Sequence, residues 1–200
     1  SGRAARMALE AQNSTLQAPR VLRRAIPLYE LMDEEGLVAL ENQADWILKE
    51  IGVEFLNDQE SLALLKEAGA SVDGTRVRFE PGLAKALCKT APSSFRMEGR
   101  APKHSVTIGG DSVVFTPAYG PPFVSDLDRG RRYATLEDFQ NFVKLAYMTP
   151  FLHHSGGTVC EPVDIPVNKR HLDMVYAHLR YSTKPFMGGV TSPQRAQDSI

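Results

Sequence analysis

The sequence has only two cysteines, and this shortage limits how the chain can be held together. Cys88 and Cys160 lie in unrelated contexts, and neither belongs to a C-x-x-C pair. The count excludes a disulfide framework and a zinc ribbon, because both need several cysteines at short spacing. We therefore expect two free thiols in a reducing cytoplasm.

Neither sign of charge is in excess. The chain carries 23 Lys and Arg against 24 Asp and Glu, which gives a formal net charge of −1 at pH 7. This balance provides no basic surface for nucleic acid and no acidic tail. No apolar run approaches the roughly 20 residues that span a membrane. The arginine-rich segment 1–24 lacks the apolar stretch of a secretory signal, and we expect a flexible arm that packs on a partner subunit or elsewhere on the full-length protein.

Helical periodicity and turn signals dominate the first half of the chain. An apolar stripe predicts a helix over about 33–51, before Gly52. Shorter helices are predicted to start near Asp58 and Pro81, with a hairpin at Asp73-Gly74 between them. We therefore predict a helix-rich N-terminal region over residues 1–100. The residues of the stripe are Leu37, Leu40, Ala44, Ile47 and Ile51.

A stretch rich in proline, serine and glycine, residues 91–104, is the predicted boundary to a second region. Beyond it, hairpins are predicted around Gly109-Gly110-Asp111 and around Asp128-Arg129-Gly130. We expect the three arginines near the second turn to be solvated. These are Arg129, Arg131 and Arg132.

After Tyr133 the pattern alternates between helices and buried strands. Strands are predicted at 151–159 and 185–190, and helices are predicted to start at Thr135, near 168 and at Ser192. The strands start 34 residues apart, from 151 to 185, which is typical of parallel β/α units. Two helix faces are predicted to be apolar, one with Phe139, Phe142, Val143 and Ala146 and the other with Leu172, Val175, Tyr176 and Leu179.

We therefore predict an α/β fold in which residues 101–200 form the first part of an incomplete TIM-type (β/α) barrel. A closed barrel needs about eight strands, more than this region can supply. An open doubly wound sheet is the competing architecture. Its phosphate-binding turn is missing, because Ser155-Gly156-Gly157-Thr158 is not G-x-G-x-x-G.

Three stretches are distinctive: LHHSGGTVCEPVDIPV at 152–167, KRHLDM at 169–174 and STKPFMGG at 182–189. Together with residues 116–132 and the helical block 33–53, they resemble the trimethylamine methyltransferase family. The resemblance implies a TIM-barrel enzyme that takes a methyl group from a tertiary or quaternary amine, such as trimethylamine or glycine betaine. The acceptor is the cobalt of a corrinoid (cobalamin) held by a separate small protein, so this chain itself is expected to bind no cofactor.

The resemblance also implies a protein well over twice this length, and we expect a homo-oligomer in the full-length form. One branch of the family carries a pyrrolysine in a later part of the barrel, and these residues do not distinguish the branches. We expect the 200 residues alone to be inactive, because an unclosed barrel leaves strand edges unpaired. Two alternatives remain, a truncated barrel that acts only as an interaction module and an unrelated β/α-barrel lyase. For the lyase, Lys184 is the only lysine whose sequence context suits a Schiff base.

The carboxyl ends of barrel strands carry the active site, and glycines mark two such ends here. Gly156 and Gly157 precede Thr158, and Gly188 stands at the matching place one unit later. Glycines let a ligand approach the backbone, although the same pairs could simply allow tight packing. Tyr119 has an aromatic face that could hold a quaternary ammonium, or it could plug the barrel floor. We predict that Tyr119, Gly156, Gly157 and Gly188 line one substrate cavity.

Charged and basic side chains near these glycines allow several functions. Glu161 would stabilise a cationic amine, although it and Asp164 also suit a helix cap or the surface. We predict no metal site at His153 and His154, because neighbouring strand residues point to opposite faces. One of these two is expected to be buried and hydrogen-bonded, and the other to pack between barrel and helices. We expect His171 and His178 to face solvent on a helix, and no catalytic residue is identified.

Overall fold

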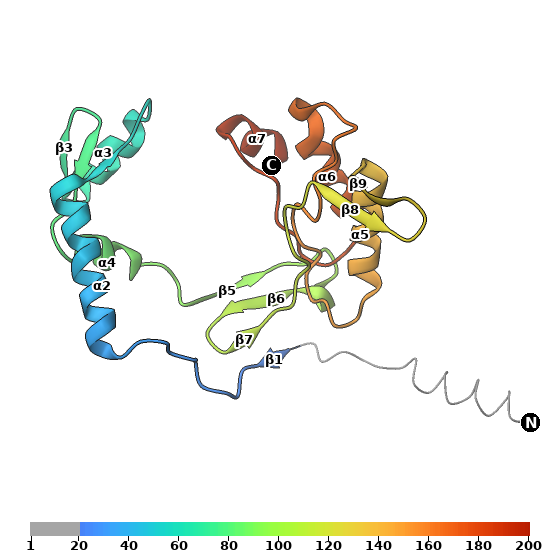
Figure 1. Cartoon of the computed structure of the whole chain (residues 1–200), viewed down its shortest axis with the longest axis horizontal. Helices are drawn as coiled ribbons and strands as arrows, with labels where there is room; N and C mark the ends of the chain where they lie inside the picture. Colours follow the sequence, from blue (N-terminus) through green and yellow to red (C-terminus); the bar gives the residue numbers. More distant parts are fainter. Residues whose placement is uncertain (1–20) are drawn as a thin grey trace, which may run out of the picture. The chain divides into compact units, whose positions relative to one another are not determined.

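The computed structural model describes residues 21–200, so most of the predicted N-terminal arm, residues 1–20, lies outside the described residues. The described chain divides into two compact units. One comprises residues 26–93, and the other combines 21–25 with 94–200. Figure 1 shows the helices and strands of both units along the chain.

The unit of residues 26–93 begins with a long helix at the predicted place. Helix α2 (Glu34–Trp46) is capped by Asp33, whose carboxylate accepts the Gly36 N–H at 2.9 Å. It continues into one π-helical turn, η1 (Ile47–Ile51), and ends at Gly52 with φ 71°. A side chain at Gly52 would stand 2.4 Å from the Val77 carbonyl oxygen, so glycine is required there. None of the residues of α2 or η1 is buried, and the predicted apolar stripe is exposed.

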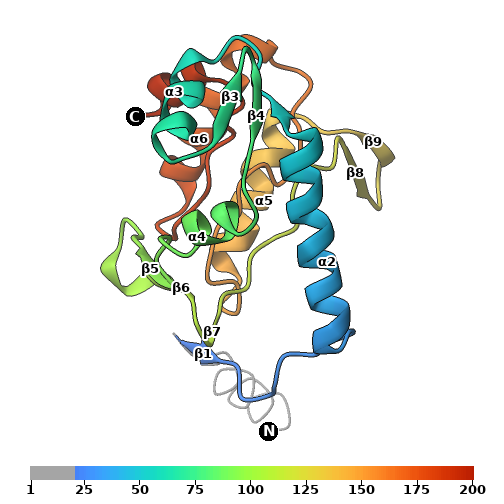
Figure 2. The same ribbon diagram turned by 90° about the vertical axis from the view of Figure 1, so that its left-hand side faces the viewer.

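A small sheet and two short helices complete this unit. Figure 2 shows the predicted hairpin of β3 and β4 beside α3, and its turn at Asp73-Gly74 is confirmed. The strands pair antiparallel in the order β2-β4-β3. The elements are β2 (Val53–Glu54), α3 (Gln59–Glu67), β3 (Ser71–Asp73), β4 (Arg76–Arg78) and α4 (Leu83–Cys88). Their core consists of Leu62, Ala70, Val77 and Phe79.

The second unit contains three two-stranded antiparallel sheets. Strand β5 (Ser94–Met97) pairs with β6 (Val106–Gly109) across the short helix η2 (Pro102–His104), and β1 (Leu22–Arg23) pairs with β7 (Ser112–Val113). The predicted pairing across Gly109-Gly110-Asp111 is therefore wrong, because β6 and β7 each take a different partner. The hairpin of β8 (Phe123–Asp126) and β9 (Gly130–Tyr133) is confirmed.

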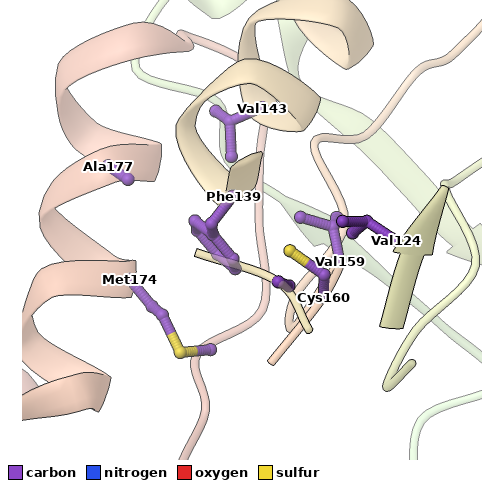
Figure 3. Close-up of a cluster of buried hydrophobic side chains, with 8 residues drawn as sticks. Val124, Phe139, Val143, Val159, Cys160, Met174 and Ala177 are labelled. Carbon is purple, nitrogen blue, oxygen red and sulfur yellow. The ribbon is translucent and has the colours of Figure 1, made fainter. Parts of the chain in front are cut away.

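Helices α5 (Leu136–Met148), α6 (Val167–Tyr181) and α7 (Pro193–Ser199) follow as predicted. Thr135 and Asp138 form a capping box at the start of α5, and Ser192 caps α7. Figure 3 shows how α5 and α6 enclose the core with β8 and the segment before α6. The core residues are Val124, Ala134, Phe139, Val143, Val159, Cys160, Met174 and Ala177.

The predicted apolar face of α6 is wrong. Leu172, Tyr176 and Leu179 are 43%, 60% and 42% exposed. The buried face instead carries His171, Met174, Ala177 and His178. On α5 the prediction is confirmed for Phe139, Val143 and Ala146, while Phe142 is exposed.

The predicted strands at 151–159 and 185–190 do not form, and within residues 21–200 the structure contains no barrel. The fold is a mixed α/β arrangement with small antiparallel sheets. Gly156, at φ 89°, breaks the extended backbone, and Pro117, Pro121 and Pro185 have no N–H to donate to a ladder.

Three irregular segments nevertheless lie side by side: 115–121, 153–161 and 185–189, here called the aligned segments. His153 N–H donates to Phe115 O at 3.0 Å, and Gly120 N–H donates to Thr158 O at 2.7 Å. Ser155 N–H donates to Pro185 O, and Met187 N–H to Gly156 O, both at 2.9 Å. Residue numbers rise together in each pair of bonds, so all three segments run in the same direction, with 153–161 in the middle.

Candidate functional site

The aligned segments bring Tyr119 next to Gly157. The Tyr119 Cε1 atom lies 3.6 Å from the place where a side chain at Gly157 would begin. Met187 closes the other side, with its carbonyl oxygen 3.2 Å from that place and its sulfur 3.5 Å from the Tyr119 hydroxyl. The Tyr119 residue is 44% exposed, whereas Gly157 is buried. An accessible aromatic ring therefore stands beside bare glycine backbone.

The other predicted glycines have distinct surroundings. Gly156 is buried, and a side chain there would stand 2.8 Å from Val159 Cγ1, so its role is to turn the chain toward Gly157. Gly188 is exposed, and its nearest neighbour would be Val190 Cγ2 at 3.6 Å. Thr158 bonds the Gly120 N–H through its carbonyl, which fixes the turn that follows Tyr119.

The two carboxylates that follow this turn have partners in helices. Glu161 forms an ion pair with Arg170 of α6, so its charge is already compensated. Asp164 Oδ1 accepts the Leu136 N–H at 2.8 Å and so caps α5, in agreement with the capping alternative. Glu161 is thus placed after the glycine turn as expected, but in a structural ion pair.

The histidines of the middle segment hold the backbone. His153 stacks on Phe115 at 5.9 Å between centroids and accepts the Phe115 N–H through Nδ1. His154 is buried and accepts the Gly156 N–H at 2.9 Å. Burial lowers the pKa of His154 to about 4, so the ring is neutral at pH 7. The prediction that one of the two is buried and hydrogen-bonded is confirmed.

Comparison with known proteins identifies the family. Residues 1–200 match the model of the protein family described as trimethylamine methyltransferase (MTTB). The chain belongs to this family. The resemblance noted in the sequence is therefore confirmed.

Two relatives in this methyltransferase family act on betaines, by their names. The chain is 40% identical over 175 residues to glycine betaine methyltransferase of Desulfitobacterium hafniense (strain Y51). The matched region makes up 88% of the chain and 36% of the relative. The chain is 28% identical over 155 residues to proline betaine:corrinoid methyltransferase of Eubacterium limosum. Here the matched region makes up 73% of the chain and 30% of the relative. The chain thus spans about a third of the length of these relatives.

Two helix histidines of this family member are not where the sequence predicted. His171 and His178 were expected to face solvent, and both are buried. His178 Nε2 lies 2.9 Å from the Gly157 carbonyl oxygen. The signal was their spacing with Met174, which places all three on one face of α6.

One of the three arginines at the β8–β9 turn differs from the prediction. Arg132 is largely covered and bridges Asp126 and Asp138, so it holds the β8–β9 hairpin to the start of α5. Arg131 lies over the Phe123 ring, 4.0 Å from the centroid. Arg132 is therefore structural, whereas Arg129, with its side chain 60% exposed, and Arg131 are exposed to solvent as predicted.

Lys184 is a buried residue for which the sequence alone suggested Schiff-base chemistry. Its ammonium donates to the carbonyl oxygens of Ala146 and Thr149, at 2.7 and 2.8 Å, at the carboxyl end of α5. Burial lowers the pKa of Lys184 to about 8. These contacts make it a cap for α5. Across residues 21–200, no three His, Cys, Asp or Glu side chains come together as metal ligands would, and no helix is long and apolar enough to cross a membrane.

Proposed function

We propose that this chain contributes the amine-binding part of a betaine methyltransferase, which transfers a methyl group from a quaternary ammonium to the cobalt of a corrinoid protein. Membership of the family supports methyl transfer, and the names of both relatives point to betaines. In this proposal the aligned segments take the places of the first strands of a (β/α) barrel, because they run parallel at a spacing of one β/α unit.

The observation that carries the proposal is the exposed Tyr119 ring beside the Gly157 backbone. A quaternary ammonium has no N–H to donate, so an aromatic face is a suitable partner for its charge. A side chain at Gly157 would crowd Met187 and the Tyr119 ring, so the glycine lets the ring lie close to this backbone. Gly188, exposed and without a side chain, leaves the neighbouring backbone open to a bulky partner.

The roles in this reaction are divided between two proteins. A corrinoid on the partner supplies the cobalt that accepts the methyl group, as the name of the proline betaine relative suggests. Residues of this chain hold the ammonium and exclude other geometries. Tyr119 and Gly157 are the proposed contacts, with Gly156 and Thr158 shaping the turn and Glu161 fixing α6 beneath it.

The test is methyl transfer from glycine betaine to a corrinoid protein, measured with the full-length protein. Tyr119→Ala is expected to weaken glycine betaine binding about tenfold, or about 1.4 kcal/mol. Tyr119→Phe is the matched control, because it keeps the ring and loses only the hydroxyl contacts with Met187 and Thr116. Equal affinity in wild type and Tyr119→Ala would show that the ring does not bind the substrate.

A second candidate is an interaction module without catalysis. It is favoured by the uncovered apolar residues of α6, namely Leu172, Tyr176 and Leu179. Full-length protein that transfers no methyl group from glycine betaine, proline betaine or trimethylamine would favour this candidate. The proposed homo-oligomer is tested separately by sedimentation of the same protein.

A further inference from the structure

We infer that His178 is a positioning residue of the betaine site: it fixes the Gly157 backbone beside Tyr119 and aligns it with Met187. The inference rests on the proposed function, because the site that His178 positions is the betaine site defined there. His178 is 2% exposed and contacts the site through the Gly157 carbonyl oxygen, so it is not a proposed contact of the ammonium.

The first observation is the hydrogen bond between α6 and the glycine turn. His178 Nε2 is 2.9 Å from Gly157 O, and a carbonyl oxygen only accepts, so Nε2 carries the hydrogen. The other ring nitrogen, Nδ1, is buried and has no hydrogen-bond partner among residues 21–200. Because the ring is 2% exposed, a second proton on Nδ1 would lie in apolar surroundings without a partner. The ring therefore stays neutral, with its one N–H directed at Gly157.

The second observation is that the same ring contacts the next aligned segment. His178 stacks on Phe186 with ring centroids 4.8 Å apart and an interplanar angle of 7°. Phe139 of α5 meets its edge at 5.4 Å and 84°. Phe186 directly precedes Met187, so one side chain holds both Gly157 and the residue opposite it.

These contacts matter because the two backbones approach closely. The Met187 N–H donates to Gly156 O at 2.9 Å, and the Met187 carbonyl is 3.2 Å from the side-chain position of Gly157. The Gly157 carbonyl accepts two hydrogen bonds, from His178 and from the Val159 N–H at 2.9 Å, and only the first ties the turn to α6. Without the His178 donor, the glycine turn would lose its hydrogen bond to α6, and its distance to the Tyr119 ring would no longer be fixed.

The experiment uses three variants of the full-length protein. His178→Leu removes the donor, and His178→Gln keeps an N–H at a similar reach. His171→Leu is the matched control, since His171 is equally buried on the same helix but contacts Asp198 of α7. Glycine betaine affinity is measured by calorimetry, and hydrogen exchange is measured at the Met187 amide. Urea midpoints of all variants are compared so that lost stability is recognised.

We expect His178→Leu to bind glycine betaine at least tenfold more weakly and to exchange the Met187 amide faster. His178→Gln should recover most of the affinity, and His171→Leu should keep both values near those of the wild type. Leucine variants at 171 and 178 with equal affinity and equal Met187 exchange would overturn the inference. If wild-type protein binds no glycine betaine, the proposed function fails, and the inference falls with it as a statement about a betaine site. The Met187 exchange rates would then report only on backbone alignment.

Discussion

A methyl group added at Gly157 would meet both neighbouring aligned segments at once. The first carbon of a side chain would stand 3.2 Å from Met187 O and 3.6 Å from the Tyr119 ring. Gly157→Val is therefore expected to push Met187 away and to fill the space proposed for the ammonium. Glycine betaine binding by the full-length protein should fall below detection in calorimetry.

Gly188→Ala is the control for this substitution, because its added carbon meets only Val190 at 3.6 Å. It should bind glycine betaine within about threefold of wild type, which is about 0.6 kcal/mol. Tight binding by Gly157→Val would place the ammonium elsewhere. The urea midpoint of each variant separates lost binding from lost folding.

The buried histidines predict a loss of stability in mild acid. Burial lowers the pKa of His154 to about 4 and also lowers that of His178, while an unfolded histidine titrates near 6.5. Between these values the unfolded chain binds more protons than the folded one, so the free energy of unfolding falls as pH drops from about 6.5 to about 4.

Urea unfolding at a series of pH values measures this effect. His154→Gln, whose side-chain oxygen can still accept the Gly156 N–H, should show a shallower fall over the same range. Equal slopes for wild type and variant would mean that His154 is not a source of the acid sensitivity. Asp138 acts in a lower window: Arg132 holds the pKa of its carboxyl well below the usual range, so its contribution is lost only below about pH 4.

Single residues were predictable where their partner is close in sequence. Asp58, Thr135 and Ser192 cap helices through N–H groups three residues on, and the sequence pattern shows such contacts directly. His178 and Lys184 were not predictable, because their partners are 21 and 38 residues away. The proximity of Tyr119 to Gly157 followed from the expected alignment of strand ends, whereas their role in binding stays a prediction.

Substitutions on two faces of helix α6 test which face stabilises the protein. Met174 is buried in the core, whereas Leu172 is 43% exposed. Met174→Ala should lower the free energy of unfolding by roughly 2–5 kcal/mol, and Leu172→Ala by about 0.5 kcal/mol or less. Urea unfolding of both variants measures the difference. The reverse order would show that the face predicted from the sequence is the buried one.

The sequence misassigned this face for a physical reason. Leucine and tyrosine mark a buried stripe only when another layer covers them, and histidine is counted as polar although hydrogen bonds allow its burial. The predicted strands failed in a similar way. Apolar residues at 151–159 pointed to a buried segment, which is largely correct, but the glycines and prolines that place Gly157 beside Tyr119 also prevent a regular ladder.

The two compact units have separate cores, and this separation can be measured. Val77 is fully buried in the unit of residues 26–93. Val77→Ala should lower the stability of that unit by on the order of 2 kcal/mol. Hydrogen exchange should therefore speed up at Val72 and Phe79, while amides of α5 and α6 keep their rates. Faster exchange throughout residues 94–200 would show a single cooperative unit.

The two cysteines give this protein an internal measure of how often its core opens. Cys88 is exposed, whereas Cys160 is fully buried between α5 and β8, and burial raises the pKa of its thiol to about 12. An alkylating reagent needs the thiolate and physical access, so at neutral pH it will modify Cys88 first. Modification of Cys160 then requires a local opening that separates the helices. The rate of Cys160 alkylation relative to that of Cys88 reports how often this opening occurs. Because Cys160 stands three residues after Gly157, a ligand that tightens the glycine turn would slow this alkylation. The reactivity of this native thiol would then show whether a ligand occupies the proposed site.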